Sequence, residues 1–374
     1  MVKKLKVGFV NFAPLHYDVL TPFNRPLGGS ESNMCFSCIE LAKRGHDIIL
    51  YGLYDKMFRL KNVTHKDKSF LENIEKEKLD CLVIQNTIYN TPLFKNTAGR
   101  NFKIILWQQL HTDQPPTFAL ENVDVRASID KYVFVSNWQM EKFLARYPLE
   151  EKKCFVIKNA VSPAFENLFP NKSILKYKKP ILAYTSAPFR GLETLLVYLF
   201  PEIKKCFPEV KLKVFSSMKT YQKNDAENAV YKHLYDICRT TDGVIYRGSV
   251  SQKQLARELK PVIALTYPNT FYETSSIAVM EAMAAGCKVI TTASGALPET
   301  TAGFAHLIPV NDNYSENREM FIKHTIETLN KLKSQDKSLE EELSKQVKFC
   351  NKNYIWKKRA IEWEKLLSSL SRFC

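Results

Sequence analysis

The sequence lacks long hydrophobic runs and any cysteine pattern that marks a metal site. No stretch reaches the roughly 18 uninterrupted apolar residues that a membrane helix requires. The opening residues, Met1-Val-Lys-Lys-Leu-Lys-Val-Gly-Phe-Val10, contain no apolar region long enough for a signal peptide and instead predict a first strand. The chain has 9 cysteines, and only Cys35 and Cys38 form a CxxC pair, for which packing inside a helix is the favoured role. An odd number of cysteines without a signal predicts reduced thiols and a cytoplasmic protein.

Acidic residues are fewer than basic ones. The chain carries 54 lysines and arginines against 39 aspartates and glutamates, a net charge of +15, and more of the excess lies in the C-terminal half. A net positive charge of this size favours an anionic partner, which can be a nucleotide-sugar, an acidic membrane surface or a nucleic acid. A nucleic-acid-binding protein would show clustered basic residues with interleaved aromatics. No such cluster surrounds the motifs described below, so we expect no nucleic-acid partner.

Short apolar runs alternate with longer helical runs along the chain. They lack period-two alternation, as expected for strands buried on both faces of a parallel sheet. The predicted strands are Leu5–Phe12, Ile48–Tyr51, Cys81–Gln85, Lys103–Trp107, Lys131–Ser136 and Cys154–Lys158, then Pro180–Ser186, Val210–Ser216, Gly243–Arg247, Val262–Thr266, Cys287–Thr292 and Ala305–Pro309. The length of 374 residues suits two domains. We therefore expect two doubly wound α/β domains.

The pattern is interrupted once, over Asn159–Lys179, where Pro163 and Pro170 fall among polar residues without a clean period. This predicts an interdomain linker. Near the end of the chain, Trp356, Ala360 and Trp363 form one apolar stripe at helical spacing, which predicts a packed terminal helix. The expected organisation is a first domain over 1–165, a linker over 166–179, a second domain over 180–350 and a helix within 351–374.

Two glutamates, Glu273 and Glu281, are the most informative residues. Seven residues separate them, and Glu281 lies in an otherwise apolar, helix-forming run. A buried carboxylate without partners costs several kcal/mol or takes up a proton, so Glu281 requires a local hydrogen-bond donor. Sugar or ribose hydroxyls are suitable donors. A solvated glutamate on an amphipathic helix is the plainer alternative.

Two segments have the features of phosphate-binding loops. Gly28-Gly29-Ser30-Glu31 lies between a predicted strand and a helix, where glycines allow positive φ and close approach, and where free N–H groups can meet an anion. An ordinary helix start remains the alternative. Arg190 and Gly191 lie in a strand–loop–helix segment. A helix terminus supplies about 0.3–1 kcal/mol toward an anion, too little for a pyrophosphate, so a fixed cation is needed and Arg190 is placed for it.

The string from Tyr267 to Gly286 resembles the Glu-seven-Glu signature of retaining glycosyltransferases of the GT-B fold, family four, also called group 1. Ser294-Gly-Ala-Leu-Pro-Glu299 matches a pattern that follows it in this family. The resemblance implies that Glu273 faces the donor sugar and that Glu281 binds the ribose hydroxyls. The helix start after Glu273 would place backbone amides near phosphate or sugar, and its polar residues should cap the helix. The implied catalytic residues are Glu273, Arg190 and His111; the implied donor-binding residues are Gly28, Gly29, Ser30, Arg190, Gly191, Arg247, Ser249, Glu273, Thr274, Ser275, Ser276 and Glu281.

Some positions match the family less completely. His111 follows a predicted strand and matches a histidine that approaches the donor sugar, although a structural or surface role is the alternative. The segment that begins Arg247-Gly-Ser249 resembles one whose backbone reads the nucleotide base. The family commonly has two cations at its phosphate clamp. Here Arg190 matches one of them, and Ser186 or a neighbour stands at the other, so Arg247 and Lys253 are the candidates for the second cation.

The resemblance implies a GT-B protein with two Rossmann-like domains facing across a cleft, the first on the acceptor side, and a C-terminal helix crossing back to it. The implied reaction moves a sugar from a UDP- or GDP-sugar to a glycan, lipid-linked or protein-linked acceptor, with retention at the anomeric carbon. No Asp-x-Asp pair occurs, so we expect no metal and no cofactor. A peripheral membrane contact stays open. So do a different GT-B activity, such as an epimerase or a phosphorylase, and an inactive transferase-like scaffold.

Overall fold

The computed structural model describes residues 3–88, 101–170, 173–222 and 225–370. Within these residues the chain divides into two compact units. The first is drawn from Met1–Pro22, Gly29–Asn159 and Trp356–Cys374, and the second from Phe23–Gly28 and Ala160–Ile355. Most of the stretch predicted as a linker is therefore counted in the second unit.

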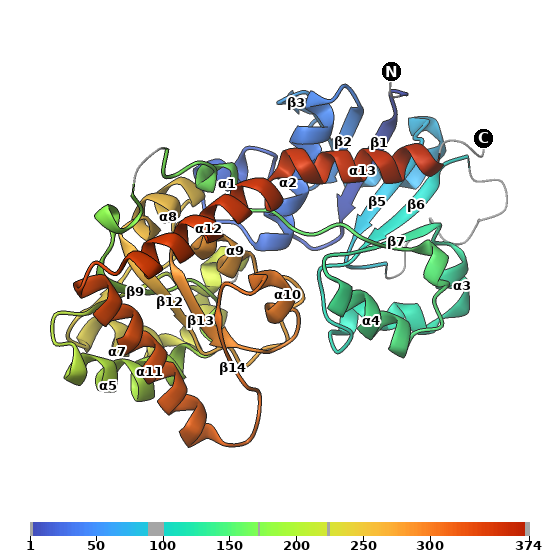
Figure 1. The fold of residues 1–374 in the computed structure, drawn as a ribbon. Helices are drawn as coiled ribbons and strands as arrows, with labels where there is room; N and C mark the ends of the chain where they lie inside the picture. The colour runs from blue at the N-terminus through green and yellow to red at the C-terminus, as the bar shows by residue number, and fades with distance from the viewer. Residues whose placement is uncertain (1–2, 89–100, 171–172, 223–224, 371–374) are drawn as a thin grey trace. The chain divides into compact units, whose positions relative to one another are not determined.

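The first unit is built on an eight-stranded sheet (Figure 1). Its order is β3-β4-β2-β1-β5-β6-β7-β8, and every pairing is parallel except β3 with β4. The strands are β1 (Lys6–Asn11), β2 (Asp47–Gly52), β3 (Phe58–Leu60), β4 (Val63–Asp67), β5 (Cys81–Gln85), β6 (Lys103–Trp107), β7 (Lys131–Phe134) and β8 (Cys154–Val156). Its helices are α2 (Gly29–Lys43), α3 (Val123–Ala127), α4 (Asn137–Arg146) and α13 (Trp356–Leu370), and the short α1 (Thr21–Asn24) spans the boundary between the units.

The C-terminal helix α13 packs on the first unit, next to α2. Its apolar stripe is buried as the sequence predicts: the Trp363 ring centroid lies 6.2 Å from that of Phe9 on β1 and 5.1 Å from that of Trp107 on β6. Arg44 and His46 both contact the Glu364 carboxylate, and the hydrogen bond from Arg44 lowers the pKa of that group. The predicted return of the terminal helix to the first domain is confirmed.

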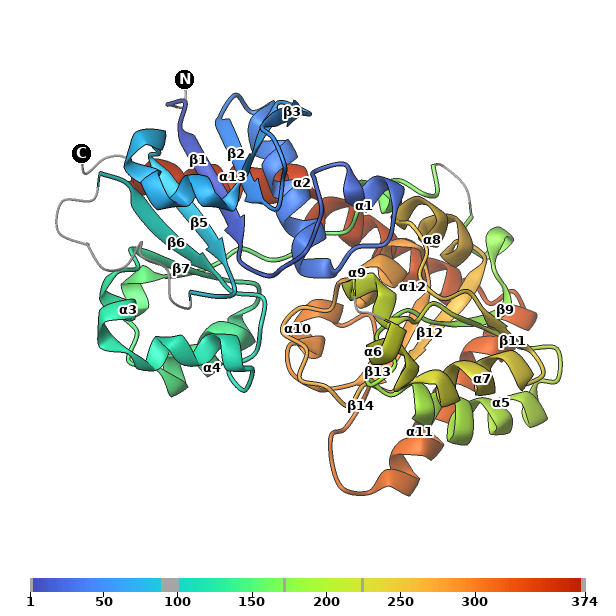
Figure 2. The same cartoon turned by 180° about the vertical axis from the view of Figure 1, so that it is seen from behind.

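The second unit contains a six-stranded, fully parallel sheet of order β11-β10-β9-β12-β13-β14. The strands are β9 (Lys179–Tyr184), β10 (Lys211–Val214), β11 (Val244–Tyr246), β12 (Val262–Tyr267), β13 (Lys288–Thr292) and β14 (His306–Ile308). The helices are a π-helix (Thr194–Leu199), α5 (Phe200–Cys206), α6 (Asp225–Ala229), α7 (Lys232–Thr240), α8 (Gln252–Leu259), α9 (Ile277–Ala284), α10 (Leu297–Thr301), α11 (Tyr314–Lys333) and α12 (Lys337–Asn353). Figure 2 shows this unit from behind, with α5, α7 and α11 together on one side, and α12 packs on α9.

Both units are doubly wound α/β structures, so the predicted fold class is confirmed. The local differences have physical causes. Residues 192–206 are helical, and the π-helix Thr194–Leu199 changes to α5 at Phe200, where Pro201 has no N–H to continue the hydrogen-bond ladder. The sequence also missed the β3–β4 hairpin, whose polar residues give no apolar run.

The charge-rich segment 331–348 belongs to two helices. The segment contains the end of α11 and most of α12, separated by a turn in which Gln335 has a positive φ of 53°. Leu339, Leu343 and Val347 on α12 are buried in the core of the second unit. Among the described helices, none is long and apolar enough to cross a bilayer.

Candidate functional site

The sheet of the second unit has a topological switch point between β9 and β12. From the central strand β9, the chain adds β10 and β11 on one side and then β12, β13 and β14 on the other. Ligands of open parallel sheets bind outside the carboxyl ends of the strands at such a point. The loop with Arg190 leaves from β9, and the loop with Glu273 leaves from β12.

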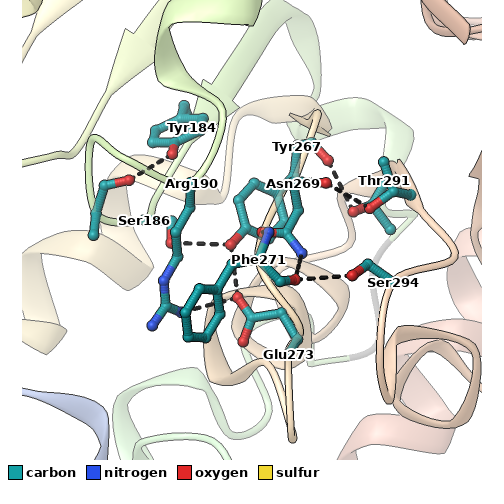
Figure 3. Close-up of polar contacts among 11 residues, drawn as sticks. Tyr184, Ser186, Arg190, Tyr267, Asn269, Phe271, Glu273, Thr291 and Ser294 are labelled. Atoms are coloured by element: carbon teal, nitrogen blue, oxygen red, sulfur yellow. Dashed lines mark hydrogen bonds and ion pairs between the residues drawn. The ribbon is translucent and has the colours of Figure 1, made fainter. Parts of the chain in front are cut away.

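The structure brings Arg190 and Glu273 into direct contact at this point (Figure 3). Arg190 Nη1 donates to Glu273 Oε1 at 2.9 Å, and the Tyr267 hydroxyl donates to the same oxygen at 2.7 Å. Ser186 Oγ lies 3.1 Å from the Tyr267 hydroxyl oxygen. Two segments more than 80 residues apart in sequence therefore form one polar cluster.

Aromatic rings lie against the arginine. The Arg190 guanidinium carbon lies 4.4 Å from the centroid of the Phe271 ring and 5.5 Å from that of Phe189. The side chain of Arg190 is 22% exposed. A partly desolvated guanidinium beside aromatic faces is restrained in position and interacts more strongly with an anion than a fully solvated one does.

The loop that carries Glu273 is fixed by its neighbours. The hydroxyls of Thr291, Thr292 and Ser294 donate to the carbonyls of Tyr267, Asn269 and Phe271, respectively. The Ala296 N–H donates to the Glu273 carbonyl at 2.7 Å. The end of β13 and the residues that follow it therefore bind the loop after β12.

Two glycines with positive φ make the close approaches in this loop possible. A Cβ at Gly295, where φ is +63°, would lie 2.3 Å from the Glu273 carbonyl oxygen. A Cβ at Gly191, where φ is +99°, would lie 1.9 Å from the Pro268 carbonyl oxygen. Close packing against the Glu273 carbonyl therefore explains the glycine of the Ser294–Glu299 motif. Gly191 is explained in the same way, and its predicted contact with the donor stays a prediction.

The start of α9 has unused hydrogen-bonding capacity. Ser276 stands at the N-cap in an extended conformation, but its side chain makes no capping hydrogen bond, so the expected polar cap is not formed. Ser275 Oγ is buried and has no hydrogen-bond partner within the described residues. Thr274 is buried beside it. An uncapped helix start with an orphaned hydroxyl fits an anionic ligand.

Glu281, on α9, is 4% exposed and has partners supplied by the protein. Its carboxylate accepts hydrogen bonds from the Ser162 backbone N–H and from the Gln252 side chain at the start of α8. Burial outweighs these bonds and raises the pKa of Glu281 to about 8. The solvated-glutamate alternative is wrong, because this carboxyl is enclosed.

The predicted base-reading segment lies after β11. Arg247 Nη2 is 3.6 Å from Glu258 Oε1, and Lys213 Nζ is 2.6 Å from Glu258 Oε2. Ser249 Oγ is 2.7 Å from Thr220 Oγ1. Lys253 is exposed on α8. The structure therefore pairs Arg247 with a carboxylate, while its role and that of Lys253 as a second phosphate cation stay predictions.

The predicted Gly-Gly loop leads into α2 at the switch point of the other sheet, between β1 and β5. Gly29 and Ser30 form the first turn of α2, and neither Gly28 nor Gly29 has a positive φ. The Ser30 carbonyl accepts a hydrogen bond from Gln85, and Asn11 Nδ2 donates to Glu31 Oε1 at 3.1 Å. Burial raises the pKa of Glu31. Contact of Gly28, Gly29 and Ser30 with a donor stays a prediction.

The segment with His111 is positioned by a polar network in the first unit. Gln139 on α4 donates to the Leu110 carbonyl at 2.7 Å, and Asn159 donates to Gln109 at 2.9 Å. His111 Nδ1 is 2.9 Å from Asp113 Oδ1, and its ring stacks on Trp138 with 5.1 Å between centroids. This network joins the segment that carries His111 to α4 and to Asn159.

The chain is similar to known glycosyltransferases. Residues 180–329 match the family model described as glycosyl transferases group 1, a range that includes Arg190, Glu273 and Glu281. No curated protein sequence matches the chain. Among solved structures, its fold is similar to a glycosyltransferase from Rickettsia africae (17% identity, 98% of each chain covered, TM-score 0.72). It is also similar to sucrose-phosphate synthase from Thermosynechococcus elongatus (15% identity, 99% of this chain and 100% of that chain, TM-score 0.70). A third is HepE from Anabaena, solved with UDP and glucose (13% identity, 98% and 100%, TM-score 0.68).

These findings define the class of protein. Residues 180–329 are a group 1 glycosyltransferase domain, and enzymes of this class move a sugar from a nucleotide-sugar donor to an acceptor. The chain therefore contains a group 1 (family four) glycosyltransferase domain, and its two α/β units with the returning C-terminal helix have the GT-B architecture.

Sequence reasoning missed four residues of the site. Tyr267 looks like a core residue at the end of a buried strand, and Ser186 is noticeable only as a departure from the family pattern. Ser162 and Gln252 bind Glu281 from separate segments. No local signal connects them to it.

Proposed function

We propose that this protein transfers a sugar from a nucleotide-sugar to an acceptor hydroxyl with retention at the anomeric carbon, and that Arg190, Glu273 and Glu281 form the donor site. The observation that carries the proposal is the contact of Arg190 with Glu273 at the switch point of the second sheet. A cation for the leaving phosphate and a carboxylate for sugar hydroxyls are held side by side. The uncapped start of α9 and the orphaned Ser275 hydroxyl lie in the same segment.

Each group of the donor would be bound by the residues whose charge and hydrogen-bonding capacity complement it. Arg190 and the first-turn amides of α9 bind the phosphates, because both supply donors to an anion. Glu273 accepts hydrogen bonds from the sugar hydroxyls, and Glu281 accepts them from the ribose hydroxyls. UDP is the first nucleotide to test, because HepE is solved with UDP and with UDP-glucose. A GDP-sugar stays the second candidate.

The proposed reaction takes place on one face of the sugar. The bond from the anomeric carbon to the phosphate oxygen breaks, and the acceptor oxygen bonds to the same carbon from the same side. The acceptor's proton passes to a phosphate oxygen of the leaving nucleoside diphosphate. Arg190 and the backbone amides stabilise the charge that develops on this leaving group. No protein side chain is then needed as the nucleophile.

His111 is proposed to contact the donor sugar, on the basis of its match to the family histidine. Asp113 and Trp138 restrain its ring, which suits a residue that binds in one orientation. The acceptor is proposed to be a glycan or a lipid-linked or protein-linked acceptor, and its hydroxyl is the attacking group in each case.

A thermal-shift screen with UDP, GDP, ADP, CMP and dTDP, each with and without its sugar, tests the proposal. A ligand at 100 times its dissociation constant stabilises a protein by about 2.7 kcal/mol. We expect one nucleotide to shift the wild type and to lose most of its effect on Glu281→Ala. Absence of a shift with every nucleotide would contradict the donor site and favour an inactive scaffold. Turnover of the donor into an isomer or a sugar phosphate without acceptor would favour an epimerase or a phosphorylase.

A further inference from the structure

A chain of hydroxyl groups leads to Glu273. Ser186 Oγ and the Tyr267 hydroxyl oxygen are 3.1 Å apart, and the Tyr267 hydroxyl lies 2.7 Å from Glu273 Oε1. An ionised carboxylate can only accept, so the single proton of the tyrosine hydroxyl must point to Glu273. Ser186 then donates to the tyrosine oxygen. The order of donation from Ser186 through Tyr267 to Glu273 is therefore fixed.

Tyr267 is held too firmly to follow Glu273 if the carboxylate moves. It is the last residue of β12 and is fully buried, with its ring centroid 5.7 Å from that of Tyr184 in an edge contact. Its carbonyl accepts a hydrogen bond from Thr291 Oγ1 at 2.8 Å. Burial, and next the charge of Glu273, raise the pKa of Tyr267 well above its usual range, so the hydroxyl stays protonated. It is a fixed donor and takes no part in proton transfer.

The contacts of the Glu273 carboxylate are asymmetric. Tyr267 and Arg190 both donate to Oε1. These two bonds set the rotation of the carboxylate, because they approach one oxygen from two separate strand ends. We propose that Tyr267 is a positioning residue for Glu273, holding Oε1 so that Oε2 is presented to the hydroxyls of the donor sugar. This inference rests on the proposed function of Glu273 as the sugar-facing carboxylate.

Ser186 supports this role. It stands near the position where the family pattern has a second cation, and in this chain it hydrogen-bonds to Tyr267. A cation there would compete with Arg190 for the Glu273 carboxylate. A neutral hydroxyl instead orients the tyrosine and leaves Arg190 as the charged partner of Glu273 within the described residues.

The test compares sugar binding with nucleotide binding. UDP and UDP-glucose are titrated by calorimetry into the wild type, Tyr267→Phe and Ser186→Ala, with Tyr184→Phe as the matched control. Tyr184 is an equally buried tyrosine in the same cluster, but its hydroxyl donates to the Ala187 carbonyl and not to Glu273. Tyr267→Phe should weaken binding of UDP-glucose by about 10- to 100-fold, because a carboxylate that is no longer held in place loses a hydrogen bond from the sugar, and it should leave binding of UDP nearly unchanged. Ser186→Ala should show a smaller effect of the same kind.

If Tyr267 had only a structural role, Tyr267→Phe would weaken the binding of UDP and of UDP-glucose equally, and that result would overturn the inference. So would an unchanged ratio of the two dissociation constants. An equal loss of affinity for UDP-glucose in Tyr184→Phe would also count against the inference, because the effect would then belong to the whole aromatic cluster.

A second measurement needs no ligand and separates this inference from the proposed function. Tyr267→Phe, Glu273→Gln and the double variant are unfolded in urea and followed by circular dichroism. If Tyr267 holds the carboxylate, the two changes should couple by about tenfold in the unfolding constant. If the wild type binds neither UDP nor UDP-glucose, a UDP-sugar donor is refuted, and the coupling alone decides whether Tyr267 positions Glu273. Independent effects of the two changes would overturn the inference.

Discussion

Replacing Glu281 by glutamine should change how the stability of the second unit depends on pH. The pKa of Glu281 is raised from 4.5 to about 8 because the carboxyl is buried. The folded protein thus favours the protonated form. The stability this provides is fully present below pH 4.5 and is lost as the pH rises through 8.

The magnitude follows from the shift. One pKa unit corresponds to about 1.4 kcal/mol. The unfolded chain ionises Glu281 above pH 4.5 while the folded protein keeps the proton up to about pH 8, so this difference lowers the stability by about 3 kcal/mol at pH 7 and by about 1 kcal/mol at pH 5. Glutamine has nearly the same shape and does not titrate. We therefore expect Glu281→Gln to gain about 2 kcal/mol relative to the wild type between pH 5 and pH 7.

The assay must report on the second unit. All 4 tryptophans, at positions 107, 138, 356 and 363, belong to the first unit, so tryptophan fluorescence would follow the wrong part of the chain. Hydrogen exchange of peptides from β12 to β13, measured at both pH values, follows the correct part. Glu341→Gln, an exposed glutamate of the same unit, is the control and should show no such trend. A constant difference between wild type and Glu281→Gln would refute the reasoning.

The proposed ligand adds a second test of the same group. If ribose hydroxyls donate to the ionised Glu281, nucleotide binding must release the proton that the free protein holds at pH 7. Calorimetry in buffers of different ionisation enthalpy should show this release. No release with the wild type would mean that Glu281 binds the ribose as a neutral acid or does not bind it.

Three further changes test other parts of the structure. Arg190→Ala should lower sugar transfer by about 100-fold or more, with Arg190→Lys partly active, because one fixed cation at a leaving group supplies about 3 kcal/mol; normal turnover in Arg190→Ala would remove it from the site. Gly295→Ala should weaken donor binding and lower stability, because its Cβ would clash with the Glu273 carbonyl. Gly303→Ala is the control: its φ is also positive, but its Cβ would have nothing within 4 Å, so donor binding should fall less in binding assays. Trp363→Ala should destabilise the first unit by about 3–5 kcal/mol in urea unfolding followed by fluorescence; a loss below about 1 kcal/mol would show that α13 is not part of its core.

The sequence predicted the central strands better than the edges. The bounds of β5 and β6 agree with the prediction because these strands are continuous apolar runs, buried on both faces. The β3–β4 hairpin was missed, since β4 (Val-Thr-His-Lys-Asp) is held by pairing with β2 and not by an apolar pattern. Tertiary hydrogen bonding, absent from any local window, determines such an edge.

The site was predicted in part for a similar reason. Arg190 and Glu273 are recognisable from the motifs around them, and the strand order brings them together. Tyr267 was not recognised, because a tyrosine at the end of a buried strand is indistinguishable in sequence from a core residue. The raised pKa of Glu281 follows from complete burial on α9, which the apolar run indicated.

The return of α13 to the first unit has a consequence for the order in which the protein can be made. Phe9, Phe36 and Trp107 are synthesised early, but their partners Trp356 and Trp363 leave the ribosome only after the entire second unit. Until then, part of the first core is exposed to solvent. During translation the later unit can therefore complete its fold before the earlier one, and a chain arrested before Trp356 would present an unpaired aromatic surface to chaperones or to aggregation.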